Sequence, residues 1–141
     1  MSDDDRQDLA ALSAELARRL AGAELPLLAV YELTMWEYIA LSRLRRGEAA
    51  TQRELAKAIR YDRTRLIALL DGLEAKGLVV RSVDPTDRRA RIVRATTCGR
   101  RRHAAAQAAI WKMEDRLLTD LTGGERRVFR SVLERLACGS R

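Results

Sequence analysis

Apolar residues recur at three- and four-residue steps along most of this chain, which is the spacing of one face of an α-helix. The pattern predicts helices over about residues 8–21, 35–46, 52–59, 63–76, 99–120 and 123–137. Gly47 and Gly77 are expected to end the second and fourth of these helices. Pro26 is expected to break the segment after the first helix, because proline removes a backbone donor. The sequence therefore predicts a mainly α-helical protein.

Three of the predicted helices begin with a specific signal. Each start combines a threonine with a glutamate three residues later: Thr34 with Glu37, Thr51 with Glu54, and Thr122 with Glu125. In this capping box the hydroxyl and the carboxylate satisfy free amide groups at the helix start. Apolar residues at helical spacing follow each pair, so the matches together favour helix starts at these positions.

Two short β-prone runs interrupt the helical pattern: Leu78–Val83 and Ala90–Thr96, separated by a charged turn that contains Pro85. They predict a β-hairpin. Immediately before it, the helices at 52–59 and 63–76 are separated only by residues 60–62, and Asp62 can cap the second helix. Two helices joined so closely form a helix-turn-helix, and a hairpin after them makes a winged helix-turn-helix.

The first, fifth and sixth predicted helices lie outside this module and carry long apolar stripes. The stripes of the first and last helices are Leu9, Leu12, Leu16 and Leu20, and Phe129, Val132, Leu133 and Leu136. A module this small cannot cover them all, so we expect them to meet in a homodimer. The expected fold is mainly α with a small β-hairpin, in a single domain over residues 1–141. It comprises a winged helix-turn-helix lobe at about residues 33–97 and dimerisation helices at about 8–32 and 98–138.

The positive charge of the chain is concentrated at the hairpin. Eight arginines and two aspartates lie between Arg81 and His103, a net +6 within a formal +7 for the whole chain. The pI near 10.2 predicts a polyanionic partner, either nucleic acid or an anionic membrane surface. No run approaches the roughly 20 apolar residues that span a bilayer. The acidic start does not fit a secretory signal, and Cys98 and Cys138 stand far apart, as reduced thiols. We therefore expect a cytoplasmic protein with no membrane partner.

The helix predicted at 63–76 is the candidate reading helix for the major groove of DNA. Thr64, Ala68 and Asp71 point away from its leucine face, and the small Ala68 lets the backbone approach base edges. Arg63 and Arg65 are expected to make bidentate contacts to guanine. The alternative is that these arginines only solvate an ordinary surface helix.

The hairpin tip carries Arg88 and Arg89, and either side chain can enter the minor groove and meet its negative potential. The alternative is that Asp84 and Asp87 neutralise them in a surface turn. Both readings hold together if the acids fix the loop while one arginine stays free.

Two further segments suit phosphate groups. Arg91 and Arg94 alternate with Ile92 along the second strand and are expected to share one solvent face. Phosphate is also expected at the start of the helix at 52–59, where free amides combine with Thr51, Gln52 and Arg53.

Within residues 51–99 the stretches TQRELAKAI, LLDGLEAKGLVVR, DPTDRRARIV and TTCG resemble the multiple antibiotic resistance regulator (MarR) family. The flanking helices extend the resemblance over nearly the whole chain. It implies a homodimeric winged-helix transcription factor that binds pseudo-palindromic double-stranded DNA operators and is often released by a small ligand. By position, it implies that Arg88 enters the minor groove and that Arg89 pairs with Asp71 to brace the wing. Ala68 departs from members that carry a long basic residue there.

The resemblance also implies an effector pocket where the dimerisation helices meet the DNA-binding lobe. The residues available to line it are Tyr31, Trp36, Tyr38, His103 and Trp111. The alternative is that these aromatics pack a core with few other rings, and that His103 is a surface residue. Members that sense peroxides keep a reactive cysteine near the N-terminus, which this chain lacks; for Cys98 a redox role and a bystander thiol both stay open.

The sequence offers little from which to build an enzyme, since it has one histidine, no glycine-rich phosphate loop and no clustered metal ligands. No cofactor or metal is expected. The sequence predicts a sequence-specific DNA-binding transcriptional regulator, a homodimeric repressor released by a small-molecule effector. The alternative is a basic winged-helix adaptor, or an RNA-binding protein without operator specificity. The RNA-binding reading lacks the exposed aromatic platforms that RNA recognition usually uses.

Overall fold

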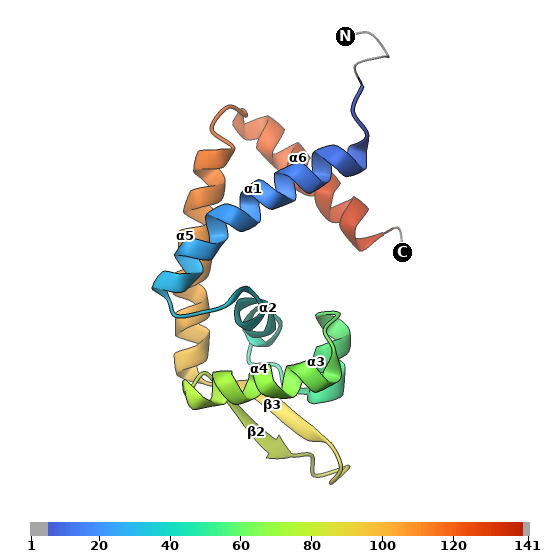
Figure 1. The fold of residues 1–141 in the computed structure, drawn as a ribbon, viewed down its shortest axis with the longest axis vertical. Coiled ribbons are helices and arrows are strands. Elements are labelled where there is room, and N and C mark those ends of the chain that lie inside the picture. Colours follow the sequence, from blue (N-terminus) through green and yellow to red (C-terminus); the bar gives the residue numbers. More distant parts are fainter. Residues whose placement is uncertain (1–5, 140–141) are drawn as a thin grey trace.

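The computed structural model describes residues 6–139 as a helical protein with one small sheet (Figure 1). Its elements are α1 (Leu9–Val30), α2 (Met35–Leu44), β1 (Ala50–Thr51), α3 (Gln52–Ala58), α4 (Arg63–Ala75), β2 (Val79–Val83), β3 (Arg91–Ala95), α5 (Thr97–Leu117) and α6 (Gly123–Cys138). The expected mainly α fold with a β-hairpin is confirmed.

The hairpin belongs to a three-stranded antiparallel sheet with the order β1-β3-β2. In the hairpin itself, Val79 pairs with Ala95 and Val83 with Arg91. The third strand, β1, pairs Ala50 with Val93 and was not predicted from the sequence. It joins the start of α3 to the hairpin, so the wing is attached to the helix-turn-helix at its base.

The capping boxes at Thr34 and Thr122 form in full. At Thr34, for example, the hydroxyl accepts from the Glu37 amide at 3.2 Å while the Glu37 carboxylate accepts from the Thr34 amide at 2.9 Å. Thr51 forms only half of its box, because the Glu54 carboxylate accepts from the Thr51 hydroxyl instead. The start of α5 has a cap that was not predicted: the Thr96 hydroxyl accepts from the Gly99 amide at 3.0 Å.

The predicted break at Pro26 is wrong, because Pro26 lies inside α1, which continues to Val30. A proline in a helix interior forfeits one hydrogen bond and strains the preceding turn. Beyond it, Leu28 is 1% exposed and Leu27 packs against the core. Burial of these two leucines offsets the cost of the proline and keeps the last turns of α1 helical.

The core lies between the sheet and the helices α2, α3 and α4, and residues of α1 and α5 complete it. Its fully buried side chains are Leu28, Leu41, Leu44, Leu55, Leu66, Leu70, Leu73, Leu78, His103, Val79 and Val93. Gly99 brings α5 against the start of β2 so closely that any Cβ there would collide with the Leu78 carbonyl. That position therefore requires glycine, and α5 leaves the lobe at a fixed point.

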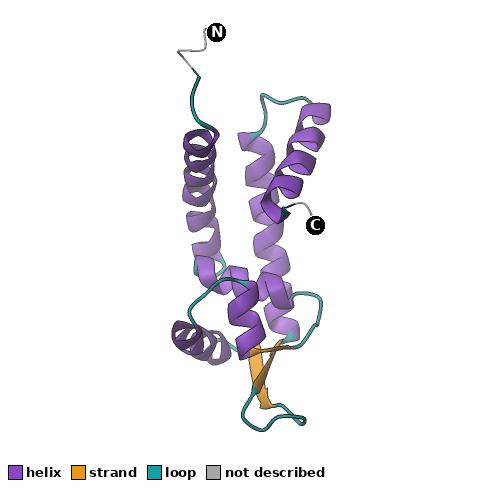
Figure 2. Cartoon of the chain, turned by 90° about the vertical axis from the view of Figure 1, so that its right-hand side faces the viewer, coloured by secondary structure: helices purple, strands orange, loops and turns teal. Residues whose placement is uncertain are grey.

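The molecule has two parts, the lobe (residues 33–97) and the arm formed by α1, α5 and α6. Figure 2 shows the wing at the free end of the lobe, with the arm helices running away from it. In the arm α6 folds back from the end of α5 and contributes no buried residue. Within residues 6–139 no helix combines the length and apolarity needed to cross a bilayer.

Candidate nucleic-acid interface

The helix α4 has one core face and one free face. Leu66, Leu70 and Leu73 are buried. The residues expected to read the major groove are all exposed: Arg63, Thr64, Arg65 and Ala68. As predicted, Asp62 caps the helix by accepting from the Arg65 amide at 2.9 Å. The helix is therefore anchored by its leucines and presents its first two turns to solvent.

The two arginines of this first turn have different surroundings. The Arg65 guanidinium lies over the ring of Tyr61, 5.2 Å from its centroid. The Tyr61 ring in turn lies beside the Trp36 ring, with their centroids 4.5 Å apart. This cation–π contact holds Arg65 at the turn between α3 and α4. Arg63 forms no ion pair with any described residue.

The start of α3 and the first half of α4 enclose a surface hollow. Its lining residues are Gln52, Arg63, Thr64 and Ile67. A second hollow begins at the same Gln52 and reaches the strands of the wing, where Arg81 and Arg91 line it. The two hollows give a concave surface from the reading helix to the wing. Ile67 was not predicted as a site residue, because sequence reasoning favoured polar and small side chains there.

The wing tip is an ordered turn in which both acids bind backbone amides. Asp84 accepts from the amide and hydroxyl of Thr86, at 2.9 and 2.8 Å, and these hydrogen bonds lower the pKa of Asp84. Asp87 accepts from the Arg89 amide at 3.0 Å. Neither Arg88 nor Arg89 forms an ion pair within residues 6–139. The carboxylates thus shape the loop while the guanidinium groups remain exposed.

The prediction that Arg91 and Arg94 share one face is wrong. Side chains alternate along a strand, so residues three apart point to opposite faces. Arg91 stands directly across from Val83 and Arg94 across from Val80. Arg91 lines the hollow beside α4. Arg94 therefore points to the other face of the hairpin.

The predicted brace between Asp71 and Arg89 takes a different arginine in this structure. Asp71 pairs with Arg81, from the middle of β2. Arg81 also donates from Nε to Glu74 at 3.1 Å. The hydrogen bonds to Glu74 and then to Asp71 raise the pKa of Arg81. The brace joins the reading helix to the wing, but at the middle of the hairpin strands rather than at the wing tip.

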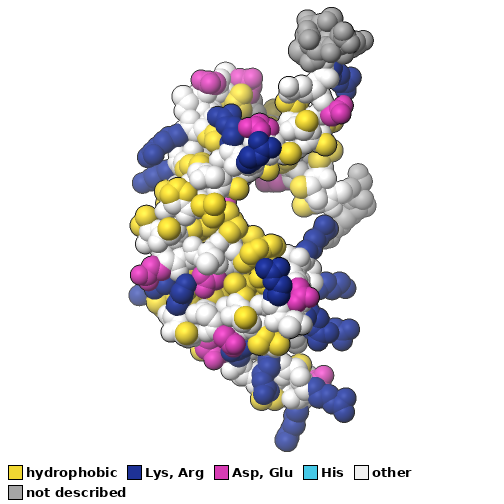
Figure 3. All heavy atoms as spheres, viewed as in Figure 1, with side chains coloured by type: hydrophobic (Ala, Val, Ile, Leu, Met, Phe, Trp, Pro, Cys, Tyr) yellow, Lys and Arg dark blue, Asp and Glu magenta, His cyan; other side chains and the backbone are white. Residues whose placement is uncertain are grey.

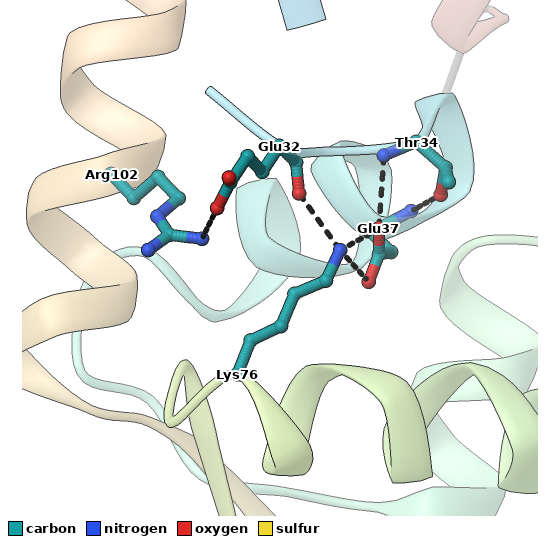
Figure 4. A network of polar contacts seen from close by, with 5 residues as sticks. All are labelled: Glu32, Thr34, Glu37, Lys76 and Arg102. Atoms are coloured by element: carbon teal, nitrogen blue, oxygen red, sulfur yellow. Dashed lines mark hydrogen bonds and ion pairs between the residues drawn. The ribbon is translucent and has the colours of Figure 1, made fainter. Parts of the chain in front are cut away.

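The far end of α4 is tied to the corner between α1 and α2 (Figure 4). Lys76 donates to the Glu32 carbonyl at 2.8 Å and to both carboxylate oxygens of Glu37 at 2.9 and 3.1 Å. Glu37 is buried, and Glu32 turns the corner with a left-handed φ of 55°. The Glu32 carboxylate lies 3.9 Å from Arg102 of α5. Removing Lys76 would leave a buried carboxylate without its cation, so this contact fixes the position of α4.

Of the five residues predicted for an effector pocket, the structure brings Tyr38 and His103 together. Their rings stack with centroids 4.8 Å apart, and His103 Nε2 lies 2.8 Å from Ser42 Oγ. The Ser42 hydroxyl donates to the Tyr38 carbonyl, so it accepts from His103, which then carries its proton on Nε2. Burial, and then the charge of Arg45, lower the pKa of His103. The reading of His103 as a surface residue is wrong.

The other three residues of that set lie elsewhere. Trp36 contacts Tyr61 near the helix-turn-helix turn, and Trp111 is 54% exposed on α5. Tyr31 packs against the core at the end of α1. Cys98 and Cys138 are both free and exposed.

Lys and Arg side chains project from the lower right of Figure 3, where the wing and the helix-turn-helix lie in Figure 1. A capped reading helix, a hairpin braced against it and exposed arginines on both define the class: this is a winged helix-turn-helix protein with a basic face. The sequence profile described as the MarR family matches residues 31–90. The chain belongs to the MarR family.

Similar proteins include regulators of known structure. A MarR-family transcriptional regulator from Rhodococcus sp. RHA1 is 28% identical, with a TM-score of 0.81 over 94% of this chain and 96% of that one. The transcriptional repressor CouR, bound to a 23-mer DNA duplex, is 30% identical, with a TM-score of 0.82 over 92% of each chain. CouR from Rhodococcus jostii RHA1 bound to p-coumaroyl-CoA matches at 25% identity, with a TM-score of 0.80 over 96% and 95% of the two chains.

Curated proteins with similar sequences are also described as transcriptional regulators. A putative transcriptional regulatory protein for the hcr operon of Thauera aromatica is 33% identical over 86 residues, 61% of this chain. The chain spans a little over half the length of the two curated relatives that it matches, 52% and 58%.

Proposed function

We propose that this protein is a transcriptional regulator that binds a pseudo-palindromic DNA operator as a homodimer. The observation that carries the proposal is the concave basic surface between α4 and the wing, where Arg63 and Arg91 line adjoining hollows. The first turns of α4 enter the major groove, and Arg88 and Arg89 at the wing tip reach the neighbouring minor groove. Thr51, Gln52 and Arg53 contact phosphate at the start of α3.

The arm supports the dimer. In the single protomer Val128, Leu133 and Leu136 of α6 are 63%, 50% and 75% exposed. At the other end of the chain Leu9 and Leu12 of α1 are 75% and 49% exposed. A hollow of about 270 Å³ separates α1 from α5 and α6, and its apolar lining consists of Leu16, Leu20, Leu118, Phe129 and Leu133. Figure 3 shows hydrophobic side chains gathered around the open space between arm and lobe. A second copy covers these surfaces, since apolar area of this extent is rarely left in water.

The dimer represses transcription and is released by a small molecule. The support is the resemblance to CouR, which has been solved both with DNA and with p-coumaroyl-CoA. In this chain the effector acts near Tyr38 and His103, which lie between α2 of the lobe and α5 of the arm. A ligand there can bias how the two parts are oriented.

The alternative is a basic winged-helix adaptor or RNA-binding protein without operator specificity. The exposed arginines at the wing tip would suit any acidic partner. An ordered wing beside a free reading helix favours duplex DNA, because the helix suits the major groove and the arginines at the wing tip suit the minor groove.

The proposal is tested by fluorescence anisotropy with the full chain. The duplex upstream of its own gene is compared with a random duplex of equal length and with double-stranded RNA. We expect at least about 10³-fold tighter binding to the upstream DNA than to the random duplex. Equal affinity for both duplexes would contradict operator recognition, and a preference for RNA would favour the alternative.

A further inference from the structure

One residue of the reading helix, Ile67, is apolar although it does not belong to the buried face of the helix. Ile67 of α4 is 48% exposed, whereas Leu66 and Leu70, on the core face of the same helix, are 1% and 0% exposed. Its neighbours in the hollow, Gln52 and Arg63, are polar or charged. Single exposed apolar residues are common on protein surfaces, so exposure alone would mean little. What distinguishes Ile67 is that it lies inside the concave surface through which the protein is proposed to read DNA.

Helix geometry places Ile67 on the same side of α4 as two residues expected to read the major groove. It follows Arg63 by four residues and Thr64 by three, so all three project from one side of the helix. Asp71 comes four residues later and is bonded to the wing through Arg81. Ile67 therefore lies between the first turn of α4 and the brace. When the N-terminal half of the helix enters a major groove, residues in this position meet base edges rather than the phosphate walls.

An isoleucine can neither donate nor accept a hydrogen bond, so it must find an apolar partner or remain in water. The phosphates and the donors and acceptors of the bases offer none. The apolar group that the major groove presents is the 5-methyl of thymine. We propose that Ile67 packs against this methyl group and so requires a thymine at one position in each half of the bound site. This inference rests on the proposed function and deepens it by naming a residue that sets sequence preference.

The experiment removes the methyl group and leaves every hydrogen bond of the base pair in place. Duplexes that bind the full-length protein are first selected from a random library. In a selected duplex each thymine is then replaced, one at a time, by deoxyuridine, which lacks only the 5-methyl. We expect one thymine in each half-site whose replacement weakens binding of the wild-type protein about fourfold, the transfer value of one buried methyl.

The variant Ile67→Ala should bind the thymine and uracil forms of that duplex equally well. Alanine is a better helix former than isoleucine and Ile67 is half exposed, so the helix should persist in the variant. Val80→Ala is the matched control. Val80 is 50% exposed in the same lobe, on the strand position next to Arg81 and hence on the hairpin face away from α4. This variant should keep the wild-type preference for thymine.

Three results would overturn the inference. Wild-type protein indifferent to uracil at every position would show that no thymine methyl is read. Equal sensitivity in the wild-type and Ile67→Ala proteins would assign the methyl to another side chain. Failure to enrich any duplex sequence would overturn the proposed function itself, and the inference with it, whereas the first two results leave operator binding intact.

Discussion

The lobe and the arm of this protein differ in how far they bury their apolar residues. In the lobe the leucines of α2, α3 and α4 close on the sheet, with Leu41, Leu55 and Leu70 all at 0% exposure. In the arm only α5 contributes several buried residues, the last of them Ile110. The 22 residues of α1 contribute a single buried side chain, Leu28, and α6 contributes none. The lobe is thus complete within one chain. The arm leaves apolar residues of the amphipathic helices α1 and α6 exposed in the single protomer, and the proposed dimer would cover them.

The difference indicates that the lobe and the arm have separate roles. A closed core holds the reading helix and wing rigidly with respect to each other, through Asp71 and Arg81 at one end of α4 and Lys76 at the other. In the proposed dimer, an open arm would leave the distance between the two lobes to be set by the interface between two chains. On the proposed function, recognition would depend on the lobe, and half-site spacing would depend on the arm.

The largest effect is expected from charges placed on the open face of the arm. The double variant Leu133→Asp/Leu136→Asp should convert dimer to monomer, because burying two carboxylates in an apolar interface is prohibitive. Light scattering after size exclusion measures the mass, and Ser131→Asp on the opposite side of α6 is the control. A double variant that remains dimeric would place the interface elsewhere.

The next largest effect tests the closed core. Leu70→Ala should lower the free energy of unfolding by about 2–5 kcal/mol, as large-to-small changes in sealed cores do. Urea denaturation at fixed protein concentration provides the value. Val80→Ala, at a half-exposed position of the same lobe, should cost less than about 1 kcal/mol. Equal losses of unfolding free energy in the two variants would mean that the lobe does not have a closed core.

A smaller effect is expected at the wing tip. Arg88→Ala should weaken binding to the selected duplex by about 1–3 kcal/mol, the scale of one good groove contact. Its unfolding free energy should not change, since the side chain is exposed and has no ion-pair partner within residues 6–139. Arg116→Ala, an exposed arginine on α5, controls for the loss of net charge. Unaltered affinity at moderate salt would remove the wing from the interface.

The smallest effect concerns the brace. Asp71 and Arg81 should couple by about 0.5–1 kcal/mol in a double-mutant cycle on DNA affinity, because the pair is partly exposed and screened. The same cycle with Arg89 in place of Arg81 should show no coupling. The reverse result, coupling to Arg89 alone, would mean that the wing changes partners when DNA binds.

The helices could be predicted because their signals are local. Thr34, Asp62 and Thr122 each satisfy amides within three residues, so a short stretch of sequence contains the whole interaction. The exception was Pro26, which was expected to break the helix. The helix continues because Leu28 packs against core residues that are distant in the sequence, and this tertiary packing overrides the local effect of proline. Strand β1 has only two residues and no periodicity to detect.

The candidate site was predictable as a set of segments but not as a set of contacts. The exposure of Arg63 and Thr64 followed from the leucine face of α4. The partner of Asp71 could not be predicted, because the choice between Arg81 and Arg89 depends on how the hairpin lies against the helix. Likewise the aromatic residues of the expected effector pocket diverge, since the direction of a side chain such as Trp36 depends on tertiary packing.

The most direct test is to measure how many protomers bind one selected duplex, and how that affinity changes with salt. Two basic lobes joined through the arm predict two protomers per duplex and a steep linear fall of log affinity with log salt concentration, from several phosphate contacts per lobe. A single protomer per duplex, or an affinity insensitive to salt, would contradict the paired lobes on which the proposed function depends.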